Sequence, residues 1–429
     1  MRHAPIPPEL FTENRNRLCA LLPPGALVIV NANDIPPTNA DGSMVGVPNS
    51  DLFYLTGVEQ EESILILFPD AHEEKHREIL FVRETNDHIA VWEGHKLTKD
   101  GARLLTGIPH VMWLHDFPVI HHLLMCQAET VFLNTNEHAR AGVQVQTRDA
   151  RFIRNTQEAF PLHRYERLAR LMHRLRPAKS ELEVKLIQEA CDITREGFLR
   201  VLDFVKPGVN ECEIEAEFIH EFTRRRSRFS YNPIIASGAN SNVLHYLSND
   251  QPCRRGDVLL LDVGAAYANY ASDMTRTIPV SGKFSKRQKQ IYQAVLRVLR
   301  GSAAALVPGV LPRDWQKHAE NLMQEELLKL GLLSTKDIKK QDPERPALKK
   351  YFMHGIGHPL GLDVHDVATI GQSIEAGWVM TVEPGIYLPE EGFGIRLEND
   401  VLVTANGPLD LMAHIPIEAG EIEELMRRR

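Results

Sequence analysis

Four acidic residues end or interrupt apolar, strand-forming runs in the second half of the chain. Asp262 closes one such run and Asp273 begins the next, while Glu383 ends a third and Glu398 lies inside a fourth. A carboxylate in a buried strand is costly unless a hydrogen bond or a cation compensates its charge. Four of them on four apolar strands therefore predict one site that holds cations.

The first two carboxylates also permit a second interpretation. A turn region over residues 264–266 separates the runs that carry Asp262 and Asp273, so paired strands would bring the two carboxylates side by side. Like charges at that distance repel, and a bound cation relieves the repulsion. In the alternative, one aspartate caps a turn and the other pairs with Arg276. This segment by itself supports both interpretations equally.

A segment rich in histidine and glycine lies between the two pairs of carboxylates. His354, His358 and His365 fall within twelve positions, together with three glycines. Glycine allows the close backbone approach that a crowded site requires. One histidine is most often a hydrogen-bonded structural residue, but three at this density favour ligands. Arg396 precedes Glu398 by two residues, so in a strand the two side chains share a face.

The donor types predict the class of metal. Carboxylates and imidazole favour Mn²⁺, Co²⁺ or Fe²⁺ over ions that prefer thiolates. The five cysteines are scattered without a CxxC pair, which argues against a disulfide framework and a thiolate zinc site. Bridging carboxylates can hold two ions, which lower the pKa of bound water and so activate the nucleophile. We expect two divalent ions, Mn²⁺ first, with Co²⁺, Fe²⁺ or Zn²⁺ as alternatives.

Composition and charge argue against several other classes of protein. The formal net charge of −8 gives no general reason to expect nucleic-acid binding. The N-terminus has no apolar core of signal-peptide type, and no apolar run approaches the ~20 residues of a membrane span. We therefore expect a cytoplasmic protein that binds neither nucleic acid nor membranes.

The 429 residues are expected to form two domains. In the first half, short β-branched runs alternate with helical patterns, which is typical of an α/β domain with a mixed sheet. Pro177 ends a basic helix, and Ser180 with Glu183 has the capping-box spacing that begins the next helix. The predicted domains are 1–177 and 178–429. The expected strands of the first are 26–31, 63–68, 78–82 and 130–134, and its expected helices are 97–105 and 117–125.

The second half shows signs of an internal duplication. An expected helix over 181–205 ends at a Pro-Gly pair and is followed by a second helix from Glu211. An expected helix over 286–306 also ends at a Pro-Gly pair and is followed by a helix from Pro312. Each helix pair precedes a glycine-rich, strand-forming region. Two such units imply a duplication, with the site where the halves meet.

The ordered residues of the expected metal site resemble those of a known family. In the pita-bread metallopeptidases, which include methionine aminopeptidase, prolidase and aminopeptidase P, the five metal ligands follow the order Asp, Asp, His, Glu, Glu. The matching positions here are Asp262, Asp273, His358, Glu383 and Glu398. The resemblance covers residues 180–429 and implies an α+β pita-bread catalytic domain with an internal duplication.

The first half resembles one branch of this family. Asn49–Gly57 and Val91–Gly94 are similar to the N-terminal domain of bacterial aminopeptidase P, the creatinase/aminopeptidase P N-terminal type. Methionine aminopeptidase lacks this domain, and creatinase shares the fold but lacks the metal ligands. The resemblance implies an Xaa-Pro aminopeptidase, a metallo-aminopeptidase that hydrolyses peptides with proline in the second position. Prolidase, limited to Xaa-Pro dipeptides, is the alternative. A non-catalytic pita-bread binding module is a more distant one, since it would not need five metal ligands.

The resemblance also implies roles for individual side chains. Glu383 would be both a metal ligand and the general acid/base, while His365 would stabilise the oxyanion and His354 would contact the substrate near the scissile bond. Three further side chains would bind the substrate: His245, Arg396 and Tyr387. Relatives form homodimers or homotetramers in which N-terminal domains help to enclose the active site. Trp92 would either serve there or lie in a buried core.

Overall fold

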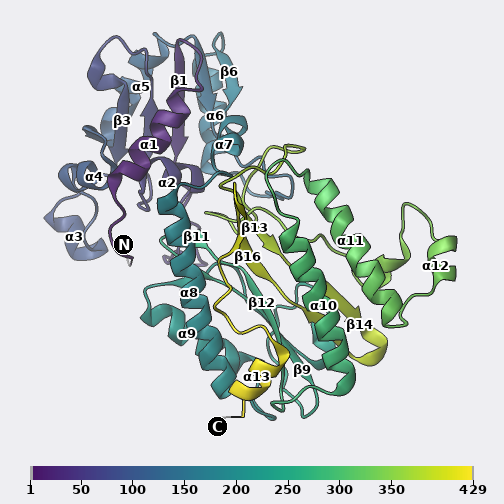
Figure 1. Ribbon diagram of the computed structural model, residues 1–429. Helices are drawn as coiled ribbons and strands as arrows, with labels where there is room; N and C mark the ends of the chain where they lie inside the picture. The colour runs from purple at the N-terminus through teal and green to yellow at the C-terminus, as the bar shows by residue number, and fades with distance from the viewer. Residues whose placement is uncertain (1–2, 428–429) are drawn as a thin grey trace. The chain divides into compact units, whose positions relative to one another are not determined.

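The computed structural model describes residues 3–427, so the first two and last two residues of the predicted domains lie outside the described chain. The described residues separate into two compact units, 3–175 and 176–427. The division falls beside Pro177. Each unit has its own sheets and core and is considered separately (Figure 1).

The first unit is built on one six-stranded mixed sheet with the order β4-β3-β2-β1-β5-β6. The β1–β2 and β2–β3 pairs are antiparallel, whereas β1–β5, β3–β4 and β5–β6 are parallel. The predicted α/β character of this half is confirmed. The strands are β1 (Ala26–Asn31), β2 (Ile64–Leu67), β3 (Glu78–Val82), β4 (His110–Trp113), β5 (Thr130–Leu133) and β6 (Arg164–Arg167).

The sequence predicted some of the helices that accompany this sheet. The predicted helices 97–105 and 117–125 correspond to α4 and α5. The unit contains α1 (Pro8–Cys19), α2 (Ser50–Thr56), α3 (Asp87–Glu93), α4 (Lys99–Thr106), α5 (Phe117–Met125), α6 (Arg148–Ala159) and α7 (Ala169–Leu175), with short 3-10 helices η1 (Glu74–His76) and η2 (Leu114–Asp116). Trp92 on α3 has 79% of its surface exposed, so the interpretation of Trp92 as a buried core residue is wrong.

The second unit contains two long helix pairs. Ser180 and Glu183 form both bonds of the predicted capping box at the start of α8. The helices are α8 (Glu181–Phe204), α9 (Glu211–Arg224), α10 (Lys286–Ala304), α11 (Pro312–Lys329), α12 (Thr335–Lys340) and α13 (Ala419–Leu425), with η3 (Gly238–Asn242), η4 (Ala347–Lys350) and η5 (Pro389–Glu391). In Figure 1, strands β9, β12, β13 and β16 lie between the α8–α9 pair and the α10–α11 pair.

The connections within the two helix pairs repeat the same geometry. Gly208, between α8 and α9, has φ +97°, and Gly309, between α10 and α11, has φ +94°. Such angles suit glycine because it has no Cβ. Each glycine N–H donates at 2.8 Å to a carbonyl of a later loop, that of Cys253 in the first case and that of Ile374 in the second. This repetition supports the predicted internal duplication.

The strands of the second unit form small antiparallel sheets. One sheet has the order β12-β9-β8, another β13-β16-β17, and β14 pairs with β15. A further sheet has the order β11-β10-β7. The strands are β7 (Arg228–Phe229), β8 (Ile234–Ser237), β9 (Val258–Val263), β10 (Ala265–Tyr267), β11 (Tyr270–Ala271), β12 (Met274–Pro279), β13 (Val379–Val382), β14 (Gly385–Leu388), β15 (Phe393–Arg396), β16 (Asn399–Thr404) and β17 (Gly407–Asp410).

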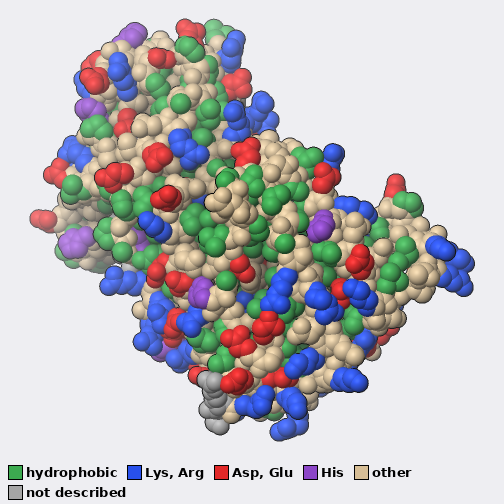
Figure 2. All heavy atoms as spheres, in the orientation of Figure 1, with side chains coloured by type: hydrophobic (Ala, Val, Ile, Leu, Met, Phe, Trp, Pro, Cys, Tyr) green, Lys and Arg blue, Asp and Glu red, His purple; other side chains and the backbone are tan. Residues whose placement is uncertain are grey.

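Two further features concern the distribution of surface charge and the hydrophobicity of the helices. Acidic and basic side chains are interspersed over the face shown in Figure 2. Within residues 3–427, no helix is both long enough and apolar enough to cross a membrane.

Candidate metal centre

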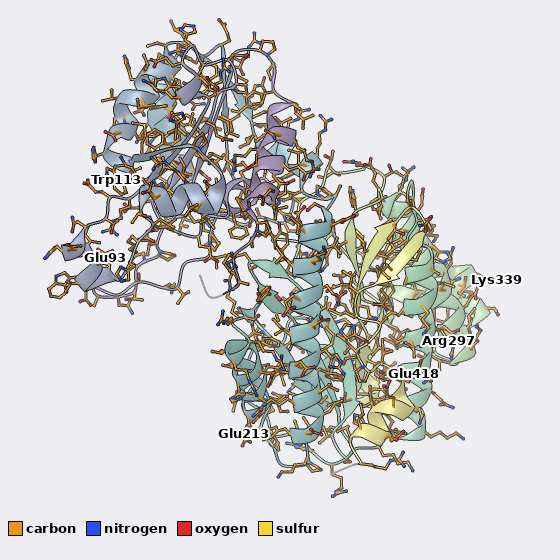
Figure 3. All side chains as sticks on the ribbon, turned by 60° about the vertical axis from the view of Figure 1, so that its left-hand side comes forward. Glu93, Trp113, Glu213, Arg297, Lys339 and Glu418 are labelled. Carbon is orange, nitrogen blue, oxygen red and sulfur yellow. The ribbon has the colours of Figure 1, made fainter. Side chains whose placement is uncertain are left out.

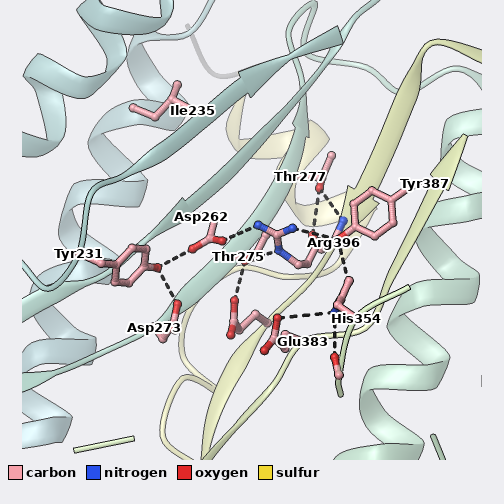
Figure 4. Close-up of polar contacts among 12 residues, drawn as sticks. Tyr231, Ile235, Asp262, Asp273, Thr275, Thr277, His354, Glu383, Tyr387 and Arg396 are labelled. Carbon is pink, nitrogen blue, oxygen red and sulfur yellow. Dashed lines mark hydrogen bonds and ion pairs between the residues drawn. The ribbon is translucent and has the colours of Figure 1, made fainter. Parts of the chain in front are cut away.

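Two aspartates lie side by side on the β9–β12 ribbon. Asp262 is in β9, directly opposite Thr275 of β12, and Asp273 immediately precedes β12. The hydroxyl oxygen of Tyr231 lies 2.6 Å from Oδ1 of each aspartate (Figure 4). The strands approach closely here, because a Cβ on Gly264 would lie 1.8 Å from the carbonyl oxygen of Ser272. The pairing of β9 with β12 therefore determines how near the two carboxylates are.

Among residues 3–427, an arginine pairs with only one of these aspartates. Arg396 of β15 forms an ion pair with Asp262. Arg276, which the alternative interpretation pairs with an aspartate, instead donates to backbone carbonyls. Its Nε bonds the carbonyl of Pro416 at 2.9 Å, and its Nη1 bonds that of Glu398 at 2.7 Å. The structure thus favours the first interpretation, in which the two aspartates share one site.

The two glutamates lie at points where strands change partners. Glu383 lies between β13 and β14, and Glu398 between β15 and β16. Because β14 pairs with β15 while β13 pairs with β16, both ribbons break at these residues, and Glu398 lies outside regular strand geometry. The backbone N–H of Glu398 donates to the carbonyl of Thr275 at 3.0 Å, and the hydroxyl of Thr275 donates to its carboxylate at 2.6 Å. These contacts join the glutamate to the strand that follows Asp273.

His358 faces this group from the loop before β13. Its Nε2 lies 3.6 Å from Oδ2 of Asp273 and 3.8 Å from Oε1 of Glu383. Asp273, His358 and Glu398 each offer a ligand atom, and these atoms all lie within 4.8 Å of one another. Two carboxylates and an imidazole at this spacing match the donors that divalent metal ions accept. The residues present therefore fit a divalent metal site.

The electrostatics of the cluster also favour a cation. Burial raises the pKa of Glu383 to about 7, and burial followed by the charge of Asp273 raises the pKa of Glu398 well above its usual value. Burial lowers the pKa of His358, but Asp273 and Glu383 outweigh it and bring this pKa to about 9. Crowded carboxylates resist ionisation in this way unless a positive charge compensates them. A divalent ion would supply that charge.

A row of polar side chains leads away from the carboxylates. Nη1 of Arg396 donates to the hydroxyl of Tyr387 at 2.9 Å, and Nε2 of His354 lies 2.9 Å from the same hydroxyl. Nδ1 of His354 lies 3.8 Å from Glu383 (Figure 4). Burial, with the charge of Arg396 next in size, lowers the pKa of His354 to about 3, which keeps the ring neutral at physiological pH.

The remaining two histidines differ in their surroundings. The ring of His365 stacks on that of His358, with centroids 3.9 Å apart and planes inclined by 13°. His245 is exposed on the segment after η3. Within residues 3–427, no hydrogen bond, ion pair or ring contact joins it to the other predicted site residues, whereas Glu398 is linked to Arg396 through Thr275. The structure thus brings nine of the ten predicted side chains into one network, leaving His245 beside it.

A buried ion-pair network holds the histidine-rich loop. Nζ of Lys179 lies 2.9 Å from Oδ2 of Asp366, and Arg176 pairs with the other oxygen of the same carboxylate. The backbone N–H of Asp366 donates to the carbonyl of Pro359 at 2.9 Å, which closes the loop between His358 and His365. Asp366 and its partners therefore anchor the backbone from which both histidines project.

Sequence reasoning missed three contributors to this site. Tyr231 and Thr275 bond the carboxylates of other segments, and Asp366 anchors the histidine loop. Tyr231 and Thr275 have ordinary sequence surroundings, because their role arises from register between distant strands. Asp366 directly follows His365, and its position beside a predicted functional residue was the one available signal.

Buried carboxylates and an imidazole that can hold divalent ions are typical of metal-dependent hydrolase centres. Comparison with known proteins gives the family. The model of metallopeptidase family M24 matches residues 185–405, and that of the aminopeptidase P N-terminal domain matches residues 11–132. The chain belongs to metallopeptidase family M24, which confirms the predicted pita-bread catalytic domain, the N-terminal domain type and a metallo-aminopeptidase class.

Individual relatives extend over both domains. The chain is 32% identical to the Xaa-Pro aminopeptidase of Haemophilus influenzae, over 99% of this chain and 98% of that protein. It is 33% identical to the Xaa-Pro aminopeptidase of Escherichia coli, over 97% of each. Among solved structures, aminopeptidase P from E. coli with the inhibitor Pro-Leu gives a TM-score of 0.88 at 30% identity, covering 99% of this chain and 100% of that chain. A zinc-substituted form of the E. coli enzyme with product gives 0.86 at 31% identity, over 99% of both chains.

The Tyr231 hydroxyl generates a first prediction. Tyr231→Phe keeps the ring but removes the group that contacts both aspartates, so we expect Mn²⁺ to bind the metal-stripped protein about 10–100-fold more weakly. Calorimetric titration measures the affinity. Tyr292→Phe is the control, because it removes a hydroxyl that donates to the carbonyl of Ile417 at 2.6 Å and touches no candidate ligand. Equal losses in both variants would contradict the assignment.

The Asp366 network generates a second prediction. Asp366→Asn leaves Arg176 and Lys179 buried without their shared charge, so we expect the free energy of unfolding to fall by about 3–5 kcal/mol. Asp363→Asn is the matched control in the same loop, because the Asp363 side chain is 45% exposed where it pairs with Arg176. Its expected cost is about 0–1 kcal/mol. Urea unfolding compares the two, and similar losses would show that the buried network is no anchor.

Proposed function

We propose that the chain is an Xaa-Pro aminopeptidase, which releases the N-terminal residue from peptides that have proline in second position. The observation that carries the proposal is the buried group of Asp273, His358 and Glu398, whose ligand atoms converge within 4.8 Å of one another. A non-catalytic module would have no reason to maintain such a costly cluster. The relatives that share both domains, and whose names specify this activity, support the choice of substrate.

The proposed cofactor is a pair of divalent ions, Mn²⁺ foremost, with Co²⁺, Fe²⁺ or Zn²⁺ as alternatives. The proposed ligands are Asp262, Asp273, His358, Glu383 and Glu398. When bound, such ions polarise the substrate carbonyl and lower the pKa of water. The oxygen-rich donor set supports this choice of metal.

The proposed chemistry is hydrolysis with Glu383 as general acid and base. Glu383 takes a proton from the attacking water and passes it to the proline nitrogen as the peptide bond breaks. His365 stabilises the negative charge that develops on the carbonyl oxygen. His354 is held by Tyr387 and faces Glu383, and as a neutral ring it contacts the substrate near the scissile bond.

We propose that three side chains beside the metal ligands contact the substrate: Arg396, Tyr387 and His245. Arg396 and Tyr387 are joined by a hydrogen bond and are both buried, so they form a fixed wall beside the metal ligands. Proline has a fixed φ and no amide hydrogen, so a rigid wall suits it better than a site that requires an N–H donor. His245 contacts the peptide from the exposed segment after η3.

Substrate length distinguishes the proposal from prolidase activity. With Mn²⁺ present, we expect the protein to cleave an Xaa-Pro-Xaa tripeptide and to release its first residue. An Xaa-Pro dipeptide and a tripeptide with alanine in place of proline are the matched comparisons. Chromatographic analysis of the products measures all three. Cleavage of the dipeptide alone would identify a prolidase, and cleavage of the alanine peptide at an equal rate would reject proline specificity.

We further propose a cytoplasmic homodimer or homotetramer. The first unit exposes apolar side chains in the segment after β1 and on α3, whose last residue, Glu93, is labelled in Figure 3. Exposed apolar clusters commonly mark interfaces. The residues are Ile35, Met44, Val45, Val47, Val91 and Trp92.

The assembly has a direct test. Light scattering coupled to gel filtration should give the mass of a dimer or tetramer for the natural sequence. Trp92→Glu should shift the mass toward the monomer, because it places a charge in the apolar cluster. Leu162→Glu is the control, because Leu162 is exposed but lies in a different part of the unit. A monomeric natural chain would contradict the proposal.

A further inference from the structure

The loop that carries His245 has little regular structure of its own. After η3, residues 243–250 form neither helix nor strand before the chain reaches β9. Within this segment His245 is exposed. A side chain on an irregular exposed segment has wide conformational freedom, and ordering it for binding costs free energy. A substrate-binding histidine here therefore needs a separate source of order.

One buried carboxylate accepts hydrogen bonds from residues on either side of this loop and from Tyr246 within it. Glu211, the first residue of α9, is fully buried. Its Oε1 accepts the N–H and the hydroxyl of Ser237, both at 2.7 Å, at the end of β8 and ahead of η3. Its Oε2 accepts the N–H of Gln251 at 3.0 Å, just after the loop, and the hydroxyl of Tyr246 at 2.8 Å. Tyr246 is the residue next to His245.

The position of Glu211 makes the arrangement stable. A buried carboxylate is tolerated when several donors satisfy its oxygens, and here five do so, the fifth being the side-chain amide of Asn240 at 3.4 Å. The first turn of a helix is also a favourable place for a negative charge. The N-cap of α9 is occupied independently, because Asn210 and Glu213 form a capping box. Glu213 marks this end of the helix in Figure 3. The side chain of Glu211 therefore does not cap α9, and its carboxylate is available to accept hydrogen bonds from the loop.

Two contacts of Tyr246 fix the backbone next to His245. Its ring packs on a small apolar cluster of Ile234, Ala236 and Leu260, which are buried residues of β8 and β9. With the ring packed and its hydroxyl bonded to Glu211, the backbone of Tyr246 is fixed one peptide unit from His245. The side chain of His245 therefore projects from a fixed position of the backbone.

We propose that Glu211 is a positioning residue, which acts through Tyr246 to order His245 for the peptide substrate. The inference rests on the proposed function, in which His245 contacts the substrate. Glu211 and Tyr246 themselves touch neither the substrate nor the candidate metal ligands. Their effect on the reaction therefore depends on the presence of His245.

A double-mutant cycle tests this dependence. Tyr246→Phe removes the hydroxyl but keeps the packed ring, and His245→Ala removes the group that is positioned. With an Xaa-Pro-Xaa tripeptide and Mn²⁺, we expect Tyr246→Phe to lower kcat/KM about threefold or more, mainly through KM, in the natural background. In the His245→Ala background, we expect the same change to have almost no effect. A purely structural role would produce equal losses in both backgrounds.

The charge of Glu211 has its own test. Glu211→Gln should reproduce the effect of Tyr246→Phe and lose it when His245 is absent. Thermal unfolding of each variant identifies any general loss of fold. Tyr165→Phe is the control, because its partly buried hydroxyl donates to the carbonyl of Phe160 at 2.7 Å in the first unit. It should leave kcat/KM unchanged.

The outcomes separate this inference from the proposed function. If the natural chain cleaves the tripeptide but the effects of Tyr246→Phe and His245→Ala simply multiply, the positioning role is wrong and the aminopeptidase assignment stands. If His245→Ala leaves kcat/KM unchanged, both the substrate role of His245 and the inference are wrong. If the natural chain cleaves no proline peptide, the proposed function itself fails.

Discussion

The mutual repulsion of buried carboxylates is the constraint around which the second unit is organised. Asp262, Asp273, Glu383 and Glu398 converge in one buried region, where burial raises the pKa of Asp262, Glu383 and Glu398. One arginine neutralises Asp262, and hydrogen bonds from Tyr231 and Thr275 compensate only in part. Such a cluster is costly in a protein without cations and favourable in one that binds them. Cation binding therefore explains both how the buried cluster is stabilised and why it can bind metal.

The duplicated architecture brings these charges together. Each half provides a helix pair with the same glycine connection and a ribbon of strands that breaks near its carboxylates. The aspartates come from the first ribbon, and His358 and the glutamates come from the second half. One backbone hydrogen bond and one side-chain hydrogen bond between Glu398 and Thr275 join the two ribbons directly. The site therefore requires both halves to be folded.

Much of this site follows from local sequence, and the rest depends on tertiary register. Carboxylates at the ends of apolar runs and a dense group of histidines carry a local signal, so the four carboxylates and the histidine segment were candidates from local sequence alone. The choice of His358 among the three histidines came from the family resemblance. Tyr231 and Thr275 could not, because each becomes a partner only through pairing with a segment distant in sequence. Trp92 shows the same limit, since its exposure depends on tertiary packing around α3. The helix boundaries were predictable because capping residues and Pro-Gly pairs act locally.

Anomalous X-ray diffraction from crystals grown with Mn²⁺ tests the central claim most directly. The account predicts two manganese peaks within the carboxylate cluster, with Asp262, Asp273, His358, Glu383 and Glu398 as their protein ligands. Displacement of the Arg396 ion pair from Asp262 would accompany them, because the metal would take over that carboxylate. Absence of manganese from the cluster, with the ion pair between Arg396 and Asp262 intact, would contradict the account.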